Sequence, residues 1–194
     1  LSDGFWGATQ PQAGKETERC LQAGARGIGE LAFYSAGIDR QAREALIPLA
    51  KLCAEAKAMV SLHTNEPIGH QYPGKSPMTL AQLYTLIQVT PETTWILAHL
   101  GGGLPFFAFL KKEVREVLNN TWFDTAAIPF LYRPQALKAM AGAVGLDKLL
   151  LGTDFPLLPP KRYFREFAES GLDHAELQDV LGHNAATLFD ALQT

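Results

Sequence analysis

Short hydrophobic runs that each end at a polar side chain constrain the fold of this chain more than any other feature of its sequence. MVSL is followed by His63, WILA by His99 and LLLGT by Asp154. Earlier in the chain, GARGIG is followed by Glu30. Such runs are typical of buried strands, and the stretches between them carry apolar residues at helical spacing. The pattern therefore predicts parallel strands that alternate with helices.

Six segments are predicted to be strands. They are Phe5–Ala8, Arg26–Leu31, Ala58–Leu62, Thr94–Ala98, Thr121–Asp124 and Lys148–Leu151. Helices are predicted around Lys15–Ala23, after Asp39, after Thr79, over Leu104–Leu118, over Pro134–Val144, and near the end of the chain, where Asp173 and Glu176 have capping-box spacing.

Strict alternation of strands and helices indicates the α/β class, with an all-parallel sheet that helices cover. We predict a TIM-type (β/α) barrel, with a six-stranded open sheet as the alternative. A complete eight-stranded barrel takes about 250 residues, whereas this chain has 194. We therefore expect an incomplete barrel. Residues 1–194 are interpreted as a single domain, because no linker or repeat interrupts them.

Composition and charge argue against several classes of protein. The net charge is −3, so a basic surface for nucleic acid is not expected. No apolar run reaches the ~18 residues of a membrane span, so no membrane association is expected. Cys20 and Cys53 lack metal-type spacing, which favours reduced packing residues in a cytoplasmic protein.

The four polar residues at the strand ends are candidates for a metal centre. In a barrel of this type the carboxyl ends of the strands meet at one face, which carries the active site. Glu30, His63, His99 and Asp154 would then converge there. Each residue also has a simpler interpretation: a structural histidine, a glycine-rich turn after His99, a turn cap at Asp154, or an ion pair of Glu30 with Arg26.

The segment Glu66–Lys75, with the sequence EPIGHQYPGK, is expected to lie over the mouth of the barrel. His70, Tyr72 and Lys75 are the predicted substrate contacts in this loop. A plain surface connection is the alternative. Asp124 is expected either to orient a histidine of the metal centre or to cap the next turn.

Five motifs, in order, carry a resemblance to a known family. They are HTNEP, AHLGGG with LPFF, WFDTAA, LLLGTDFP and GHNAATLF. From about Gly4 to Leu192, the chain resembles the amidohydrolase-related family of metal-dependent hydrolases, which are barrels of the amidohydrolase superfamily. The resemblance implies that His63 binds metal and that His99 is a ligand or a catalytic group. It also implies that Asp154 binds metal and takes a proton from the attacking water.

Two features depart from the simplest form of the family. Glu30 lies in GIGELAFY, which resembles the glutamate motif of the TatD-like deoxyribonuclease branch, where a glutamate helps hold two metals. The family opens with an H-x-H or E-x-H strand, and Leu1–Ala25 contains neither. By motif order the predicted strands correspond to strands three to eight. An uncovered barrel edge at Phe5–Ala8 would favour self-association as a homo-oligomer, or poor solubility.

The sequence and its resemblance lead to one main functional expectation. The chain is expected to be a metal-dependent hydrolase that uses a metal-activated water on a small carboxylate-, lactone- or amide-bearing substrate. Zinc is the expected metal, with manganese or iron as alternatives, because two imidazoles and carboxylates suit such ions. Two alternatives remain open: a metal-dependent decarboxylase or lyase of the same family, and a non-catalytic truncated relative.

Overall fold

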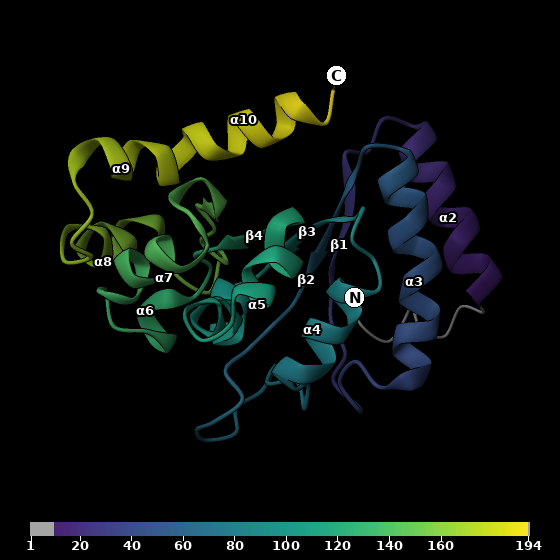
Figure 1. The fold of residues 1–194 in the computed structure, drawn as a ribbon, viewed down its shortest axis with the longest axis horizontal. Coiled ribbons are helices and arrows are strands. Elements are labelled where there is room, and N and C mark those ends of the chain that lie inside the picture. The colour runs from purple at the N-terminus through teal and green to yellow at the C-terminus, as the bar shows by residue number, and fades with distance from the viewer. Residues whose placement is uncertain (1–9, 194) are drawn as a thin grey trace.

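One parallel sheet organises the chain (Figure 1). The structure is a computed structural model, and it describes residues 10–193. The strands are β1 (Gly27–Leu31), β2 (Met59–Leu62), β3 (Thr94–Leu97), β4 (Thr121–Asp124) and β5 (Leu149–Leu150), and they lie side by side in the order of the sequence. Every neighbouring pair is parallel, as predicted. The predicted strand Phe5–Ala8 lies outside the described residues.

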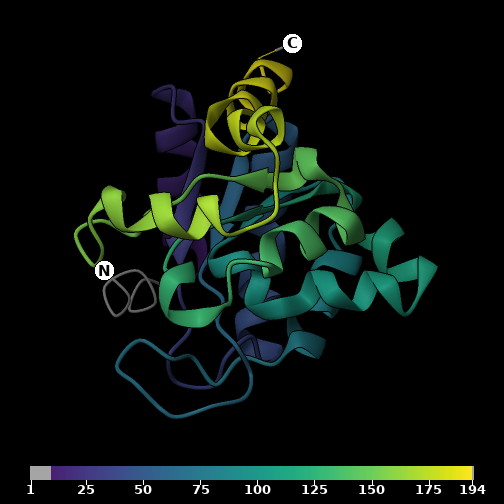
Figure 2. The same ribbon diagram turned by 90° about the vertical axis from the view of Figure 1, so that its left-hand side faces the viewer.

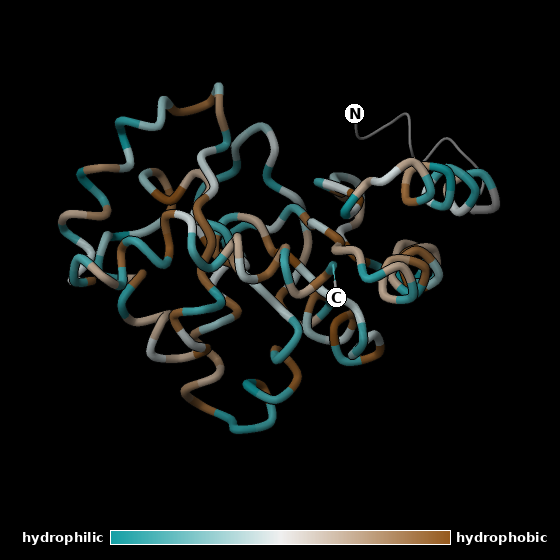
Figure 3. Tube along the Cα trace, turned by 90° about the horizontal axis from the view of Figure 1, so that it is seen from above, coloured by the Kyte–Doolittle hydropathy of each residue, from teal (hydrophilic) through white to brown (hydrophobic). Residues whose placement is uncertain are grey.

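Helices connect the strands and flank the sheet. They are α2 (Gln10–Gln22), α3 (Arg40–Glu55), α4 (Leu80–Gln88), α5 (Lys112–Val117), α6 (Ile128–Leu131), α7 (Ala136–Val144), α8 (Tyr163–Ala168), α9 (His174–Gln178) and α10 (Asn184–Ala191). In Figure 1, α2 and α3 lie next to each other on the β1 side, and α6 to α9 lie on the opposite side, beyond β4. Figure 3 shows α2, beside the N label, as mainly hydrophilic, whereas α3 has more hydrophobic turns.

Three helix starts follow the capping chemistry that the sequence predicts. Asp39 accepts a hydrogen bond from the backbone N–H of Ala42, at 2.8 Å, and begins α3. Thr79 begins α4 in a capping box, and Asp173 begins α9 in another. These side chains satisfy backbone N–H groups that have no partner within the helix.

The predicted continuous helix over Leu104–Leu118 is wrong. The chain forms a 3₁₀ segment that ends at Phe109, and then a separate helix, α5, and a short 3₁₀ turn over Leu118–Asn120. The 3₁₀ segment begins at His99 and includes left-handed backbone from Leu100 to Gly103, with φ between 52° and 91°. Pro105 follows Leu104 and cannot donate to a helical ladder. Lys111 then has extended backbone, with φ −138° and ψ 123°, between the 3₁₀ segment and α5. Apolar spacing alone therefore overestimated the length of regular helix here.

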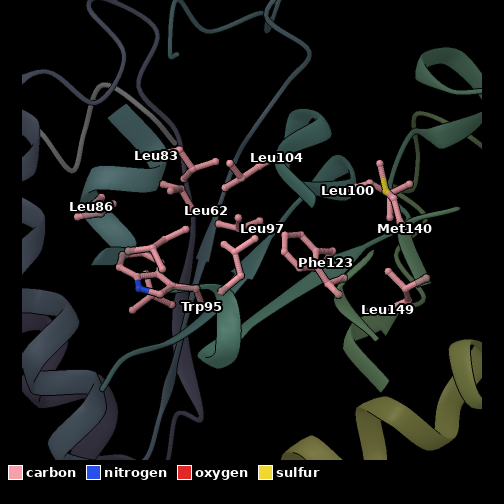
Figure 4. Close-up of a cluster of buried hydrophobic side chains, with 14 of the residues drawn as sticks. Leu62, Leu83, Leu86, Trp95, Leu97, Leu100, Leu104, Phe123, Met140 and Leu149 are labelled. Atoms are coloured by element: carbon pink, nitrogen blue, oxygen red, sulfur yellow. The ribbon is translucent and has the colours of Figure 1, made fainter. Parts of the chain in front are cut away.

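A row of apolar side chains runs across the sheet and forms the centre of the core (Figure 4). Leu62 pairs with Leu97, Leu97 with Phe123, and Phe123 with Leu149. All four side chains are fully buried. They belong to a larger cluster with side chains from the helices, including Leu83 of α4. This row holds the strands in register, because a slip by one residue would move it to the other face.

The helices of the described chain also bear on the membrane expectation. Among residues 10–193, none of them combines the length and the apolar character that a membrane span requires.

The core row yields a stability prediction. Leu97→Ala is expected to lower the free energy of unfolding by about 3 kcal/mol, because it leaves a cavity that the sheet cannot close. Leu110→Ala is the matched control, since that leucine is 71% exposed, and it is expected to change stability by less than about 0.5 kcal/mol. Urea denaturation followed by circular dichroism measures both. Equal losses in the two variants would contradict the assignment of Leu97 to the core.

Candidate metal centre and its cavity

Glu30, His63 and His99 converge at the carboxyl end of the sheet. Glu30 lies near the end of β1, His63 directly follows β2, and His99 comes shortly after β3. His63 Nδ1 lies 2.8 Å from Glu30 Oε1 and 3.1 Å from His99 Nε2. His99 Nε2 lies 3.7 Å from the same oxygen of Glu30. The three side chains form a group that could hold a metal ion, with one ligand atom from each within 4.8 Å of the others.

Backbone carbonyls determine which ring nitrogens face inward. His63 Nε2 lies 3.0 Å from the carbonyl oxygen of Gly74, and His99 Nδ1 lies 3.0 Å from that of Ala126. A carbonyl oxygen only accepts, so each of these nitrogens carries the proton and donates it. In the neutral rings, each of the two nitrogens that face Glu30 then carries a lone pair and no proton. This pattern, in which the second ring nitrogen donates to an oxygen, is typical of metal-binding histidines.

The inward-facing atoms therefore need a cation between them. Two nitrogen lone pairs and a carboxylate oxygen repel one another unless a metal ion or a proton joins them. Burial raises the pKa of the Glu30 carboxyl. The hydrogen bond and the charge of a protonated His63, with the charge of His99, lower the pKa by more, so it lies below its ordinary value. Three protein ligands of this chemistry fit a divalent metal and leave coordination positions open.

A local irregularity in β1 brings Glu30 to the centre. The pairing of β1 with β2 shifts register between Ile28 and Leu31, around Gly29. Gly29 has φ +133°, and a Cβ there would lie 2.4 Å from the carbonyl oxygen of Ser61. Only glycine permits this approach, and a bulge of this kind can redirect the next side chain.

Asp124 holds His99 through the backbone. Its Oδ1 accepts hydrogen bonds from the backbone N–H of His99, at 3.1 Å, and from that of Ala126, at 2.9 Å. Ala126 in turn supplies the carbonyl that fixes the His99 ring. Asp124 therefore both orients a histidine and caps the following turn, which joins the two interpretations of this residue. Burial raises the pKa of Asp124 to about 6.

The glycines after His99 serve a close approach between two site segments. A Cβ on Gly102 would lie 2.3 Å from the carbonyl oxygen of Asn65, and Gly102 has φ +61°. The turn after β3 therefore packs directly against the segment that follows His63. Tyr132 adds a hydrogen bond from its hydroxyl to the carbonyl of His99, at 3.1 Å. The glycine-rich turn expected after His99 is therefore present, and it also serves this close approach between two segments of the chain.

Asp154 lies on the same cavity but outside the three-residue group. The cavity has a volume of about 900 Å³ and includes Glu30, His63, His99 and Asp154 in its lining. The Tyr163 hydroxyl donates to the carbonyl of Thr153, at 2.9 Å, which supports the turn that presents Asp154. The side chain of Asp154 makes no hydrogen bond or ion pair with another residue of the described chain. Its role as a metal ligand stays a prediction.

Of the three substrate contacts that the sequence predicts in the loop Glu66–Lys75, two line the cavity, His70 and Tyr72. The ammonium of Lys75 points instead to Glu66 Oε1, at 2.8 Å, within the loop. Contact of these residues with a substrate stays a prediction. Five other residues of this loop, which the sequence placed over the mouth as a segment, also line the cavity: Glu66, Ile68, Gly69, Pro73 and Gly74. The sequence analysis did not single out the remaining lining residues, Leu31, Ala32, Tyr34, Ala127, Phe130, Leu131 and Leu157.

A family model described as amidohydrolase matches residues 4–191. The chain belongs to the amidohydrolase family. No curated protein matches this amidohydrolase sequence significantly. The resemblance of GIGELAFY to the TatD-like branch is not confirmed by these comparisons and stays a prediction.

Solved structures resemble this amidohydrolase along most of its length. A dihydroxybenzoic acid decarboxylase from Polaromonas sp. JS666, with bound manganese and the inhibitor 2-nitroresorcinol, has a TM-score of 0.72 and 19% identity, over 93% of this chain and 66% of that chain. The 5-carboxyvanillate decarboxylase from Sphingomonas paucimobilis has a TM-score of 0.72 and 16% identity, over 93% and 63%. A TIM-barrel protein from Bordetella bronchiseptica has a TM-score of 0.71 and 18% identity, over 96% and 65%.

These likenesses concern the fold. They confirm the α/β class and the relationship to TIM barrels that the sequence predicts. The amidohydrolase chain spans about two thirds of the length of these structures.

The centre predicts metal binding by the purified chain. After loading with Mn²⁺ or Zn²⁺ and removal of free metal, elemental mass spectrometry is expected to find about one equivalent per folded chain. His63→Ala and His99→Ala are each expected to lose most of it, because each removes an inward lone pair. His183→Ala is the control, since this ring is 73% exposed and bonds only to Asp179 nearby. Retention of metal in both His63→Ala and His99→Ala would contradict the site.

Proposed function

We propose that this chain carries the metal-binding and substrate-binding part of a metal-dependent decarboxylase that acts on a small aromatic or conjugated carboxylic acid. The observation that carries the proposal is the apolar and aromatic wall beside the three-residue group. Tyr34, Phe130, Leu131 and Leu157 all line the cavity together with Glu30 and the two histidines. Two of the structural neighbours described above are decarboxylases of ring-bearing acids, one with manganese and a resorcinol inhibitor.

The negative charge of the cavity lining supports the proposal that such an acid binds only when a metal ion is present. Its described lining holds three carboxylates, Glu30, Glu66 and Asp154, and no lysine or arginine. An anionic substrate would be repelled by this lining in the absence of a cation. Glu30, His63 and His99 would hold a divalent metal, which would supply that positive charge and polarise substrate oxygens. Manganese and zinc both suit this set of ligands, and either is proposed as the native metal.

The apolar wall favours loss of a carboxylate. In decarboxylation the bond between the ring carbon and the carboxyl carbon breaks, carbon dioxide leaves, and the electron pair stays on the ring carbon. A substrate ring that packs on these side chains would displace water from around the carboxylate, which would favour this step because the concentrated charge of the carboxylate becomes more dispersed. The aromatic side chains Tyr34 and Phe130 can also pack against a planar substrate.

Asp154 is the proposed proton donor to that carbon. Among the carboxylates of the described lining, Glu30 belongs to the metal group, and Glu66 accepts hydrogen bonds from Lys75 and Tyr72. Asp154 is the remaining one. Asp154 would take up a proton from solvent and transfer it to the ring carbon as carbon dioxide departs. Its carboxylate would then regain a proton from water, so that the net reaction is the acid anion plus one proton giving the arene and carbon dioxide.

Hydrolysis is the second candidate. Three protein ligands leave room for a metal-bound water, as in catalytic zinc sites. Asp154 would then take a proton from the attacking water during cleavage of a small lactone, amide or other carboxylate-bearing substrate. In both reactions the partner is a small molecule. A cytoplasmic location and self-association stay predictions.

Product analysis tests the proposal and separates it from hydrolysis. The Mn²⁺- or Zn²⁺-loaded chain is incubated with a panel of dihydroxybenzoates and with small lactones and amides. Carbon dioxide release from a benzoate, dependent on metal, is the expected result. Ring opening of lactones or amide cleavage, with no carbon dioxide, would replace the proposal with hydrolysis.

Substitution of the proposed proton donor gives a second prediction. Asp154→Asn is expected to lower kcat by at least about 100-fold, because the amide cannot supply the proton. A proton donor predicts metal content close to that of the wild type, whereas loss of metal would instead support Asp154 as a ligand. Asp190→Asn is the control, since this aspartate lies exposed on α10, away from the cavity. Full activity of Asp154→Asn would remove Asp154 from the mechanism.

A further inference from the structure

The connection between β2 and α4 is a long loop that reaches back to the metal centre. In Figure 2 it extends below the body of the molecule. Despite this excursion, the carbonyl oxygen of Gly74, far along the loop, lies 3.0 Å from His63 Nε2. His63 itself stands at the start of the same loop. The loop therefore closes on its own first residue.

Lys75, the next residue after Gly74, makes hydrogen bonds to three other residues of the loop. Its side chain is only 4% exposed. The ammonium donates to Glu66 Oε1 at 2.8 Å, to the carbonyl of His70 at 3.2 Å, and to that of Ile68 at 3.5 Å. An ammonium has three donors, and all three are used here.

Glu66 is held on both of its oxygens. The second oxygen, Oε2, accepts a hydrogen bond from the Tyr72 hydroxyl at 2.9 Å. Burial raises the pKa of Glu66, but the hydrogen bonds from Lys75 and Tyr72 lower it by more, so it lies below its ordinary value. The pair is thus an ion pair at neutral pH. Removal of the Glu66 charge would leave the buried ammonium of Lys75 without compensation.

A second pair of contacts anchors the other side of Lys75. The backbone N–H of Ser76 donates to Asn65 Oδ1 at 2.8 Å, and Asn65 Nδ2 donates to the carbonyl of Ser76 at 3.2 Å. The Ser76 hydroxyl donates to the carbonyl of Phe33, beyond the end of β1. The Gly74 carbonyl is consequently fixed by its neighbours in the chain: the buried side chain of Lys75 and the backbone of Ser76, which makes two hydrogen bonds to Asn65.

We infer that Lys75 and Glu66 are positioning residues for the metal centre: their ion pair holds the Gly74 carbonyl against His63 Nε2. The carbonyl retains the proton at Nε2 and so leaves the Nδ1 lone pair toward Glu30 and His99. Without it, the ring can turn or carry its proton at Nδ1, which would block a metal. The inference rests on the metal-binding part of the proposed function, and it gives Lys75 a role that needs no contact with substrate.

The test compares Lys75→Met with the wild type in two measurements. Methionine keeps an apolar stem and removes the three donors. Nitrogen-15 NMR of the metal-free chain, at a pH of about 8.5 where an ordinary histidine is neutral, reports the tautomer of His63. The wild type is expected to show the proton at Nε2 alone, and Lys75→Met a mixture. Calorimetric binding of Mn²⁺ or Zn²⁺ is expected to weaken by about tenfold or more in the variant.

Two further variants keep the test decisive. Glu66→Gln preserves side-chain shape but removes the charge that Lys75 needs, so it is expected to act in the same direction if Lys75→Met fails to fold. Lys51→Met is the matched control, because Lys51 is an exposed lysine of α3, and it is expected to change neither measurement.

The outcomes separate this inference from the proposed function. An unchanged tautomer and unchanged metal affinity in a folded Lys75→Met or Glu66→Gln chain would overturn the positioning role. A wild-type chain that binds no metal, but whose single His63 tautomer is lost in Lys75→Met, would overturn the proposed function and support the positioning role. A decarboxylase-inactive chain that binds metal more weakly after either substitution supports the inference as well.

Discussion

The in-register row Leu62, Leu97, Phe123 and Leu149 is the constraint on which the rest of the structure depends. Because the strands are parallel, burial of this row places all their carboxyl ends at one edge of the sheet. His63 directly follows the first of these residues, and His99 comes two residues after the second. The same hydrophobic burial that stabilises the sheet thus sets the spacing of the two imidazoles. A register slip would cost both the core and the site.

Electrostatics then explains why this edge suits a metal. Ring protons are drawn away from the centre by the carbonyls of Gly74 and Ala126, so the inward atoms are all acceptors. The described lining adds further carboxylates and no lysine or arginine, so both the site and an acidic substrate depend on a bound cation. The loop after β2 takes part in this arrangement. Contacts within the loop use the donors of its buried lysine, Lys75, and the carbonyl of the preceding residue, Gly74, accepts the hydrogen bond from His63.

Predictions from the sequence succeeded where a local pattern had only one physical solution. Five strands in the described chain and the caps at Asp39, Thr79 and Asp173 follow from short apolar runs and from side-chain acceptors at helix starts. The helix expected over Leu104–Leu118 failed, because extended backbone at Lys111 separates a 3₁₀ segment from α5, and apolar spacing does not report backbone angles. Contact of Lys75 with a substrate stays a prediction; in the structure its ammonium binds the partly buried carboxylate of Glu66, nine residues earlier, a contact that no local pattern indicates.

The sequence by itself determined the parallel α/β architecture, the family and the candidate residues at the strand ends, because hydrophobic period and strand-end chemistry are local properties. Only the tertiary structure decided that Glu30, His63 and His99 share one point while Asp154 stands apart on the cavity wall. It also decided which nitrogen of each histidine faces that point. These features depend on distances between segments that lie tens of residues apart in the sequence. They follow from the bulge at Gly29, the close approach at Gly102 and the carbonyls of two loops, and no local sequence pattern predicts any of these.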